Sequence, residues 1–372
     1  MSTRRPRIVV VGCGAVGGMI AARMTRAGPD VTPVTGNAAI TRSLSRCGYR
    51  TRELNGSEWT VPVARPPADS FATDMPGAPF DLCIAATKAT TLAVAVQAAR
   101  PHLTDTAPIV CCQNGLPEEI AATIVGRDRV LGCIVVFGAT MQDPGRYVVS
   151  ARGGLKLGRP FAESPDLTPW MMPLGAVSPA VQVADFAGAR WSKLALNCAS
   201  STLGAVGGVR LGALLRRRFV RRLVLEIWTE VAAVAAASGR SMVPIGGTFD
   251  IERMALTPEE RTRSAGSPAL VLKHALLLGI GLRYRSMRSS MLVALERGRS
   301  PEIDFLNGEV VRRGAKLRVP TPVNARLVET VNRIFAGEEG PSMKLLRKTF
   351  DEALMAASER PAASPPAARA VP

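Results

Sequence analysis

The chain of 372 residues is long enough for two domains, and its hydrophobic content of 47% is that of an ordered globular protein. The formal net charge of +17 indicates a general attraction for anionic ligands. We expect no nucleic-acid partner, because only 5% of the residues are aromatic and the densest basic stretch, residues 216–222, is typical of a solvated helix face whose Phe219 points inward.

The rest of the composition narrows the compartment and the chemistry. The longest apolar run in the C-terminal half, residues 275–282, is far too short to cross a bilayer, so we expect no membrane partner. Seven cysteines without any Cys-x-x-Cys spacing are typical of reduced core residues in a cytoplasmic protein. His102 and His274 have no second ligand at metal-binding spacing, so we expect no metal and a proton donor that is Lys, Glu or Tyr.

The first predicted element is a buried strand that runs into glycines and then into a helix. Residues 8–11 are consecutively apolar, as in a parallel strand covered on both faces, and residues 15–27 have helical spacing. Gly12 permits a tight turn, Gly14 lets the backbone approach a pyrophosphate, and Gly17 lets helix and strand pack closely. This pattern predicts a dinucleotide site at the helix N-terminus, made by Gly12, Cys13, Gly14, Ala15, Val16 and Gly17.

The second strand, predicted over residues 31–35, bears on the choice of cofactor. NAD-preferring sites close this strand with an acid that binds the ribose 2′-hydroxyl, whereas this chain has Thr35, Gly36 and Asn37 there. Because no acid would repel a 2′-phosphate, the sequence favours NADPH, with Asn37 beside the cofactor. No arginine stands at these positions, although Arg42 in the next predicted helix, residues 38–47, can reach the phosphate.

Two further buried strands end in polar residues. The strand over residues 80–86 leads to Lys88, and the strand from residue 108 leads to Asn114 and Gly115. Because the carboxyl ends of parallel strands meet at one edge of a sheet, we expect Lys88 and Asn114 to share a rim with the glycine loop. A solvated loop lysine is the alternative for Lys88. Helices over 91–99 and 118–125, a strand over 130–137 and paired strands over 147–150 and 154–157 complete the predicted sheet.

Helical patterns dominate from residue 190 onward, over 191–203, 211–238, 270–282 and 301–317. The predicted fold is therefore an α/β, doubly wound, Rossmann-like dinucleotide-binding domain followed by an all-α domain. The domain ranges are 1–188 and 189–355. Residues 356–372 are rich in Ala, Pro and Ser without periodicity, which predicts a disordered tail.

One predicted helix carries a polar row within an apolar setting. Lys193, Asn197 and Ser201 follow one another at four-residue intervals and so share a helix face, which calls for a ligand or hydrogen-bond partners. Further along, Pro301 fits the first turn of a helix ahead of Glu302 and Asp304. For these two acids, charge complementarity with a helix N-terminus is the alternative to a role in a site.

Six motifs then occur in order: Gly12-x-Gly14-x-x-Gly17, Thr87-Lys88-Ala89, Gln113-Asn114-Gly115, Trp191-x-Lys193-x-x-x-Asn197, Ser289-Ser290-Met291 and Glu302-Ile303-Asp304-Phe305-x-Asn307-Gly308. With them, residues 7–335 resemble the ketopantoate reductase (2-dehydropantoate 2-reductase) family. The resemblance implies NADPH-dependent reduction of a 2-oxo acid, with ketopantoate as the first candidate, by a homodimer.

The resemblance also implies roles for individual residues. Lys193 matches the general acid, and Glu302 matches the acid that holds substrate and cofactor in register. The substrate-binding positions are Asn114, Lys193, Asn197, Ser201 and Ser290, and the positions at the cofactor include Lys88, Asn114 and Ala139.

Three departures from the family pattern leave the substrate open. Ser201 stands where the family has a second Asn, Gly36 stands where an Arg commonly meets the 2′-phosphate, and residues 244–286 form a long, Arg-rich connection. The alternatives are a related hydroxy-acid or opine-type dehydrogenase and a non-catalytic nucleotide-binding relative. Retention of Lys193 and Glu302 disfavours the last of these.

Overall fold

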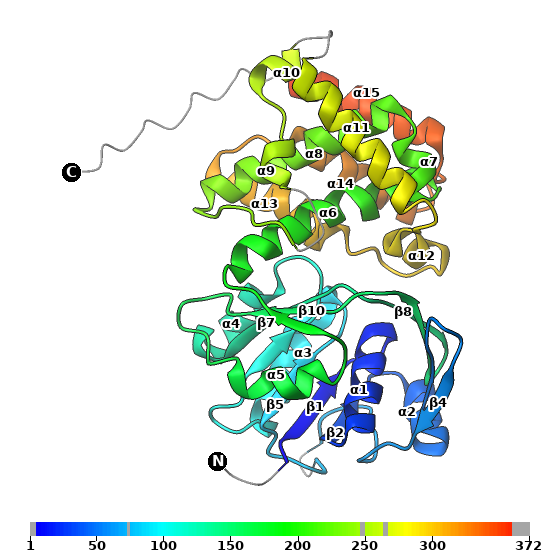
Figure 1. The fold of residues 1–372 in the computed structure, drawn as a ribbon, viewed down its shortest axis with the longest axis vertical. Coiled ribbons are helices and arrows are strands. Elements are labelled where there is room, and N and C mark those ends of the chain that lie inside the picture. Colours follow the sequence, from blue (N-terminus) through cyan, green and yellow to red (C-terminus); the bar gives the residue numbers. More distant parts are fainter. Residues whose placement is uncertain (1–4, 73–74, 246–249, 263–266, 359–372) are drawn as a thin grey trace, which may run out of the picture. The chain divides into compact units, whose positions relative to one another are not determined.

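A computed structural model describes residues 5–72, 75–245, 250–262 and 267–358. The chain divides into two compact units, Met1–Arg190 and Trp191–Pro372, which are coloured blue to green and green to red in Figure 1. The last helix, α15, runs from Met343 to Ser358, so the tail predicted from residue 356 is helical in its first three residues. Residues 359–372 of that predicted tail lie outside the described residues.

The first unit is built on a sheet of seven strands in the order β11-β10-β7-β6-β5-β1-β2. Strands β7, β6, β5, β1 and β2 run parallel to one another, while β10 runs antiparallel to β7. The bounds are β1 Arg7–Val11, β2 Asp30–Val34, β5 Leu82–Ala85, β6 Ile109–Cys111, β7 Val130–Val135, β10 Leu155–Gly158 and β11 Ala180–Gln182. The predicted Rossmann-like fold class is confirmed.

Alternate side chains of β1 enter two different cores, which is why this strand is apolar throughout. Ile8 and Val10 belong to the core that contains α1, whereas Val9 and Val11 belong to the core that contains α3 and α4. A strand covered on both faces has no polar side. The helices of this unit are α1 Ala15–Ala27, α2 Ala38–Cys47, α3 Leu92–Ala99, α4 Pro117–Val125 and α5 Thr168–Gly175.

The expectation that residues 147–150 and 154–157 pair with each other is wrong. Strand β9 (Arg146–Ala151) belongs to a second sheet of order β4-β3-β9-β8, with β3 Tyr49–Arg52, β4 Glu58–Val61 and β8 Gly138–Asp143. Buried Tyr147 holds β9 in this sheet, because its ring packs directly on Gly18 of α1. A Cβ on Gly18 would stand only 2.1 Å from the carbons of the Tyr147 ring. The Tyr147 hydroxyl also donates to the Cys13 carbonyl oxygen at 3.0 Å.

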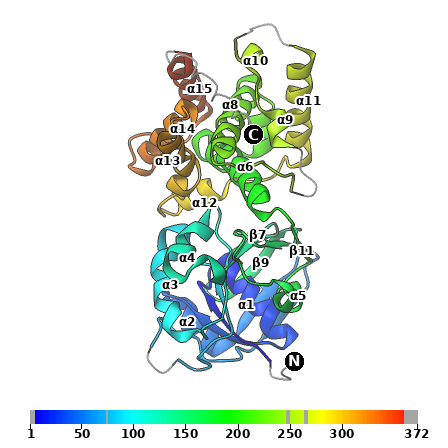
Figure 2. The ribbon, with the colours of Figure 1, turned by 90° about the vertical axis from the view of Figure 1, so that its left-hand side faces the viewer.

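The second unit is helical, as predicted. It holds most of α6 (Phe186–Gly207), with α7 Leu211–Leu215, α8 Arg218–Ala237, α9 Ile251–Met254, α10 Pro258–Thr262, α11 Pro268–Arg283, α12 Ser290–Glu296, the 3₁₀ turn η4 Ile303–Phe305, α13 Asn307–Leu317, α14 Pro322–Phe335 and α15. The view in Figure 2 separates the helices of this unit from one another. Helices α14 and α15 were not among the predicted elements.

Two predicted helices are each interrupted. The helix predicted over 211–238 is broken between α7 and α8, where the Arg221 guanidinium donates to the carbonyl oxygens of Leu215 at 2.6 Å and Arg216 at 3.0 Å. The helix predicted from Pro301 begins only at Asn307, after the turn η4. Leu306, whose backbone φ of −112° and ψ of −100° are not helical, separates η4 from α13.

Candidate active site

The carboxyl ends of four parallel strands meet at one rim of the large sheet. Strands β6, β5, β1 and β2 are consecutive neighbours, and they end next to residues 112–114, 86–88, 12–14 and 35–37. Hydrogen bonds link these strand ends: Ala86 N–H donates to the Val11 carbonyl at 2.8 Å, and Gly12 N–H donates to the Val34 carbonyl at 2.8 Å. The prediction that Lys88, Asn114 and the glycine loop share a rim is therefore confirmed for their backbone positions.

The three glycines of the loop have different surroundings. Gly12 has a φ of +96°, and a Cβ there would stand 2.6 Å from the Thr87 nitrogen. A Cβ on Gly17 would stand 1.9 Å from the Gly12 carbonyl oxygen, so helix and strand pack on bare backbone. Around Gly14, by contrast, no atom beyond its own chain neighbours lies within 4 Å of the Cβ position. This open approach to the N-terminus of α1 fits a pyrophosphate, because N–H groups and the helix dipole favour an anion there.

Cys13 takes no side-chain part in this loop. Its thiol is fully buried and lies 3.8 Å from the Val34 carbonyl oxygen, and burial raises its pKa to about 12. The carbonyl oxygen of Cys13 already accepts from Tyr147. Any contribution of Cys13 to a dinucleotide would therefore come from its backbone N–H.

Buried side chains fix the neighbouring strand ends, and sequence reasoning missed the most extensive of them. Arg190 donates to the carbonyl oxygens of Gln113 at 3.1 Å and Cys133 at 3.1 Å, and it pairs with buried Glu118. Burial raises the pKa of Glu118, and the charge of Arg190 opposes that rise. No local pattern predicts this pair, because 72 residues separate its members in the chain.

The side chain of Gln113 points toward the end of the neighbouring strand β5. Its side-chain amide donates to the Ala85 carbonyl at 3.1 Å and to the Thr87 hydroxyl at 3.4 Å. The side-chain oxygen of Gln113 is buried without a hydrogen-bond partner in the described part of the chain. The next residue, Asn114, is exposed, as is Lys88 on the neighbouring strand end.

The end of β2 differs from the prediction in one respect. Asn37 caps α2, since its side-chain oxygen accepts from the N–H groups of Ala39 at 3.0 Å and Ile40 at 3.3 Å. An acid is also present beside this strand end: Asp69 accepts from the Thr41 hydroxyl and follows Ala68, which pairs with β2. The sequence did not indicate Asp69, because Asp69 is far from β2 in the chain. It lies beside this strand only because the preceding residue, Ala68, forms an isolated bridge with Val34.

Ala139 is not brought to this rim. It lies in β8 of the small sheet, where it pairs with Val149 and packs against the core that contains α1.

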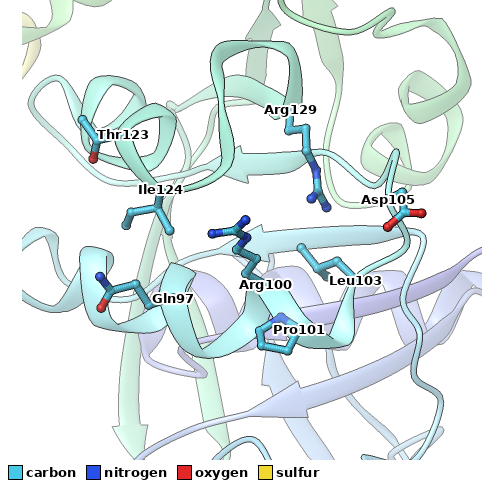
Figure 3. Close-up of a pocket in the computed structure, with 8 residues that line it drawn as sticks. All are labelled: Gln97, Arg100, Pro101, Leu103, Asp105, Thr123, Ile124 and Arg129. Carbon is cyan, nitrogen blue, oxygen red and sulfur yellow. The ribbon is translucent and has the colours of Figure 1, made fainter.

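A pocket of about 670 Å³ lies at the other end of the large sheet, near the amino ends of β6 and β7. Figure 3 shows the guanidinium groups of Arg100 and Arg129 directed toward it from two different segments. Arg129 is held in place by the carbonyl oxygens of Thr104 at 2.9 Å and Ala107 at 3.0 Å. The pocket is therefore separate from the strand ends that carry the glycine loop.

In the second unit, the polar row predicted on one helix lies on α6. Lys193 and Ser201 are partly exposed, and Asn197 is 8% exposed. The hydroxyl of Ser289 donates to the Ser201 carbonyl oxygen at 2.6 Å, and Ser289 also caps α12. This contact brings Ser290, the first residue of α12, to the same helix as Asn197 and Lys193.

Asn307 ties the segment that carries Glu302 to α6. Its side-chain amide donates to the Cys198 carbonyl at 3.2 Å and to the Asn324 side-chain oxygen at 2.9 Å, and its own oxygen accepts from the Thr202 hydroxyl at 2.6 Å. All these groups are buried. Asn307, five residues after Glu302, is therefore the residue that attaches this segment to α6, and the sequence indicated Asn307 only as part of a motif.

Behind Asn324 lies buried Glu230. Its carboxylate accepts from Val323 N–H at 2.9 Å, Asn324 N–H at 2.9 Å and the Asn324 side-chain amide at 2.7 Å. Burial raises the pKa of Glu230 to about 7, although these hydrogen bonds oppose the rise. The chain Glu230–Asn324–Asn307 therefore links α8, α14, α13 and α6 through polar groups inside the helical unit.

A glycine loop open to a pyrophosphate, followed by a helical unit with a polar row of Lys and Asn, defines a class of protein: the dinucleotide-dependent oxidoreductases with a helical second domain. The family described as ketopantoate reductase PanE/ApbA matches residues 8–160, and its C-terminal family matches residues 185–335. The chain belongs to the ketopantoate reductase family and is an oxidoreductase of that family.

Among curated relatives, the 2-dehydropantoate 2-reductase of Archaeoglobus fulgidus is 27% identical over 340 residues, which are 90% of this chain and 99% of that protein. The enzyme of the same name from Pyrococcus horikoshii is 24% identical and covers 86% of this chain and 94% of its own length.

Two solved structures show the same fold. A PanE/ApbA family ketopantoate reductase from Ralstonia eutropha has a TM-score of 0.72 at 24% identity, covering 89% of this chain and 99% of that one. A D-mandelate dehydrogenase, solved with NADH and anilino(oxo)acetate, has a TM-score of 0.72 at 20% identity with the same coverage. In the described part of the chain, no helix combines the length and the apolar character needed to cross a membrane.

Proposed function

We propose that this protein reduces the ketone of a 2-oxo acid with NADPH, with 2-dehydropantoate (ketopantoate) as the first candidate and pantoate as its product. One observation carries the proposal: the chain has the polar residues of the family, and hydrogen bonds hold the elements on which they lie. Lys193 and Asn197 share a face of α6, and Asn307 holds the Glu302 segment to that helix through the Cys198 carbonyl.

We assign two tasks to the residues of the chain: one residue donates a proton, and the others position the substrate and the cofactor. When bound, the reduced nicotinamide supplies a hydride to the carbonyl carbon. The oxygen that gains negative charge needs a nearby donor. We assign this role to Lys193, whose Nζ gives a proton to the oxygen and regains one from solvent. Asn197 and Ser290 bind the substrate, and Glu302 orients it. The backbone around Gly14 holds the pyrophosphate, with Ala15, Val16 and Gly17 at the helix N-terminus.

The decisive experiment measures NADPH consumption against a panel of 2-oxo acids that includes ketopantoate and benzoylformate. Lys193→Ala should lower kcat by about 10²–10⁴-fold, the range for a positioned acid. Its thermal midpoint and its affinity for NADPH should stay near those of the unaltered protein. Lys344→Ala, which removes an exposed lysine from α15, is the matched control and should keep full activity.

Two results would contradict the proposal. A Lys193→Ala protein with near-normal turnover and a lowered thermal midpoint would make Lys193 a structural residue. Turnover of none of the 2-oxo acids would favour a non-catalytic nucleotide-binding relative. If the enzyme turns over an aromatic 2-oxo acid but not ketopantoate, the result would support the second candidate, a related hydroxy-acid dehydrogenase. Ser201, at a position where the family usually has Asn, favours this candidate.

The preference for NADPH rests on the residues that follow β2. Thr35, Gly36 and Asn37 carry no charge, so no acid among these three residues opposes a 2′-phosphate. Asp69 beside Thr41 is the nearby charge that would weaken the preference. We also propose that the enzyme acts in the cytoplasm as a homodimer.

A further inference from the structure

The pocket near the amino ends of β6 and β7 has no part in the chemistry proposed above. Its volume of about 670 Å³ is within the range of small-molecule sites. Two of its lining residues, Leu103 and Ile124, are apolar and pack with the core that contains α3 and α4. The other lining residues are Gln97, Arg100, Pro101, Asp105, Thr123 and Arg129. All eight belong to the first unit, so one compact part of the chain forms the whole pocket.

Backbone hydrogen bonds fix the segment on one side of the pocket. The 3₁₀ turn η2 (Arg100–His102) follows α3 directly, and the Phe80 N–H donates to the His102 carbonyl oxygen at 2.8 Å. Two residues later, the Thr104 N–H donates to the Phe80 carbonyl oxygen at 2.9 Å. Residues 100–105 are therefore tied to the segment that leads into β5, and this side of the pocket needs no ligand to form.

Arg129 lies on the other side of the pocket, where hydrogen bonds hold its guanidinium without neutralising it. Arg129 ends the 3₁₀ turn η3 (Arg127–Arg129), directly before β7. Its Nε donates to the Ala107 carbonyl oxygen at 3.1 Å, and its Nη2 donates to the carbonyl oxygens of Ala107 at 3.0 Å and Thr104 at 2.9 Å. The remaining nitrogen, Nη1, takes no part in these bonds. Because carbonyl oxygens carry no net charge, the guanidinium keeps its full positive charge beside the pocket.

A second positive charge points into the same space. Figure 3 shows the guanidinium groups of Arg100 and Arg129 directed into the pocket from facing segments. Among the residues that the structure describes, neither arginine forms an ion pair with an acid. Two like charges that converge on one cavity repel each other, and an anion between them would replace this repulsion by attraction.

We propose that this pocket binds a small phosphate monoester that also carries hydroxyl groups, as a sugar phosphate does. Guanidinium groups bind phosphate through charge-assisted hydrogen bonds. A planar carboxylate presents both of its oxygens to a single guanidinium. The three terminal oxygens of a phosphate monoester point in different directions, so they can meet Arg100 and Arg129 from two sides.

Asp105 restricts the ligand further. Its carboxylate lines the same pocket, is exposed, and can only accept hydrogen bonds when ionised. It therefore matches hydroxyl groups of the ligand, and it repels a second phosphate. A nucleic-acid backbone, which continues from one phosphate to the next, would bring further negative charge toward this acid. The pocket is thus suited to a ligand with one phosphate and a neutral, hydroxyl-bearing remainder.

The test is calorimetric titration of the full chain with ribose 5-phosphate, inorganic phosphate and ribose, with and without excess NADPH. Low ionic strength is required, because salt screens exposed charges. Ribose 5-phosphate should bind equally in both conditions, since the glycine loop lies at the other end of the sheet. Inorganic phosphate should bind about tenfold more weakly, because it lacks the hydroxyl groups that donate to the charged Asp105, and ribose should not bind detectably.

Two variants and one control assign the binding to the pocket. Arg100→Gln should weaken ribose 5-phosphate binding about tenfold or more, the effect of losing a hydrogen bond to a charged group. Its thermal midpoint and turnover should stay unchanged, because the Arg100 side chain is exposed. Asp105→Asn should weaken the binding of ribose 5-phosphate but not that of inorganic phosphate. Arg46→Gln, which removes an exposed arginine from the last turn of α2, is the matched control and should bind ribose 5-phosphate normally.

Several results would overturn the proposal. Ribose 5-phosphate binding that NADPH abolishes, or that Arg100→Gln leaves unchanged, would place the phosphate at the glycine loop or elsewhere on the chain. Inorganic phosphate that binds as tightly as ribose 5-phosphate would indicate a site for a bare anion only. Arg100-dependent binding of a DNA duplex, without binding of ribose 5-phosphate, would identify a nucleic-acid contact instead. Binding of none of the probes would leave the two arginines as solvated surface residues.

Discussion

Replacement of Glu230 by Gln tests the buried polar chain behind α6. Glu230 is 3% exposed, and the pKa of its carboxyl group is raised from 4.5 to about 7, chiefly by burial. A raised pKa means that the folded state favours the protonated carboxyl. The stability that comes from this protonation is fully present below pH 4.5, and it is lost between pH 4.5 and about 7. Above that range the ionised carboxylate costs the folded state about 3 kcal/mol relative to the protonated form.

The glutamine side chain introduced by Glu230→Gln cannot ionise, so the variant lacks this pH dependence. It also exchanges one acceptor oxygen for an NH₂ group, which would face an N–H that now donates to the carboxylate, such as that of Val323. This mismatch should cost about 1–3 kcal/mol at all pH values. Glu230→Gln should therefore be less stable than the unaltered protein at pH 5, and the gap should shrink or reverse by pH 8.

Urea unfolding followed by tryptophan fluorescence is a suitable assay, because Trp228 lies on the same helix as Glu230 and its indole N–H donates to the Ala195 carbonyl at 2.9 Å. Glu338→Gln, in which the acid is exposed, is the control and should show no change in the pH dependence of stability. A stability gap that stays constant or widens between pH 5 and 8 would show that the pKa of Glu230 is not raised.

Three further changes separate ligand binding from packing. Gly14→Asp should abolish NADPH binding, which calorimetric titration with NADPH checks. Its thermal midpoint should stay nearly unchanged, because the Cβ position is open and the backbone φ of −68° suits any residue. Gly18→Ala should instead destabilise the first unit by about 1–3 kcal/mol, since its Cβ would enter the Tyr147 ring, and an unchanged melting temperature would contradict this packing. Asp69→Asn should raise the ratio of kcat/KM for NADPH over NADH about fivefold, the effect of roughly 1 kcal/mol of charge repulsion, and a fall in that ratio would remove Asp69 from the cofactor site.

Local patterns in the sequence were sufficient for the glycine loop and for six of the seven strands of the large sheet, all but β11. The helix predicted over residues 38–47 is α2, residue for residue, because Asn37 caps it at one end and Gly48 with a φ of +64° ends it at the other. The close packing of Gly17 on Gly12 was likewise predictable, since it follows from a strand that turns directly into a helix. These features depend on residues near each other in the chain, whereas the closeness of Gly12 to Thr87 comes from the neighbouring strand β5.

Only the tertiary structure decided which distant segments share an environment. The partner of β9, the place of Asp69 beside β2 and the anchoring of Asn307 to α6 all join residues that are far apart in the chain. The same limit applies to α11, whose residues 270–282 have a helical pattern that does not reveal which side faces solvent. Lys273 turns inward because Glu260 offers it a buried partner, and the leucines are left outside. Periodicity determines that a helix forms, whereas the partners available in three dimensions determine which of its faces is covered.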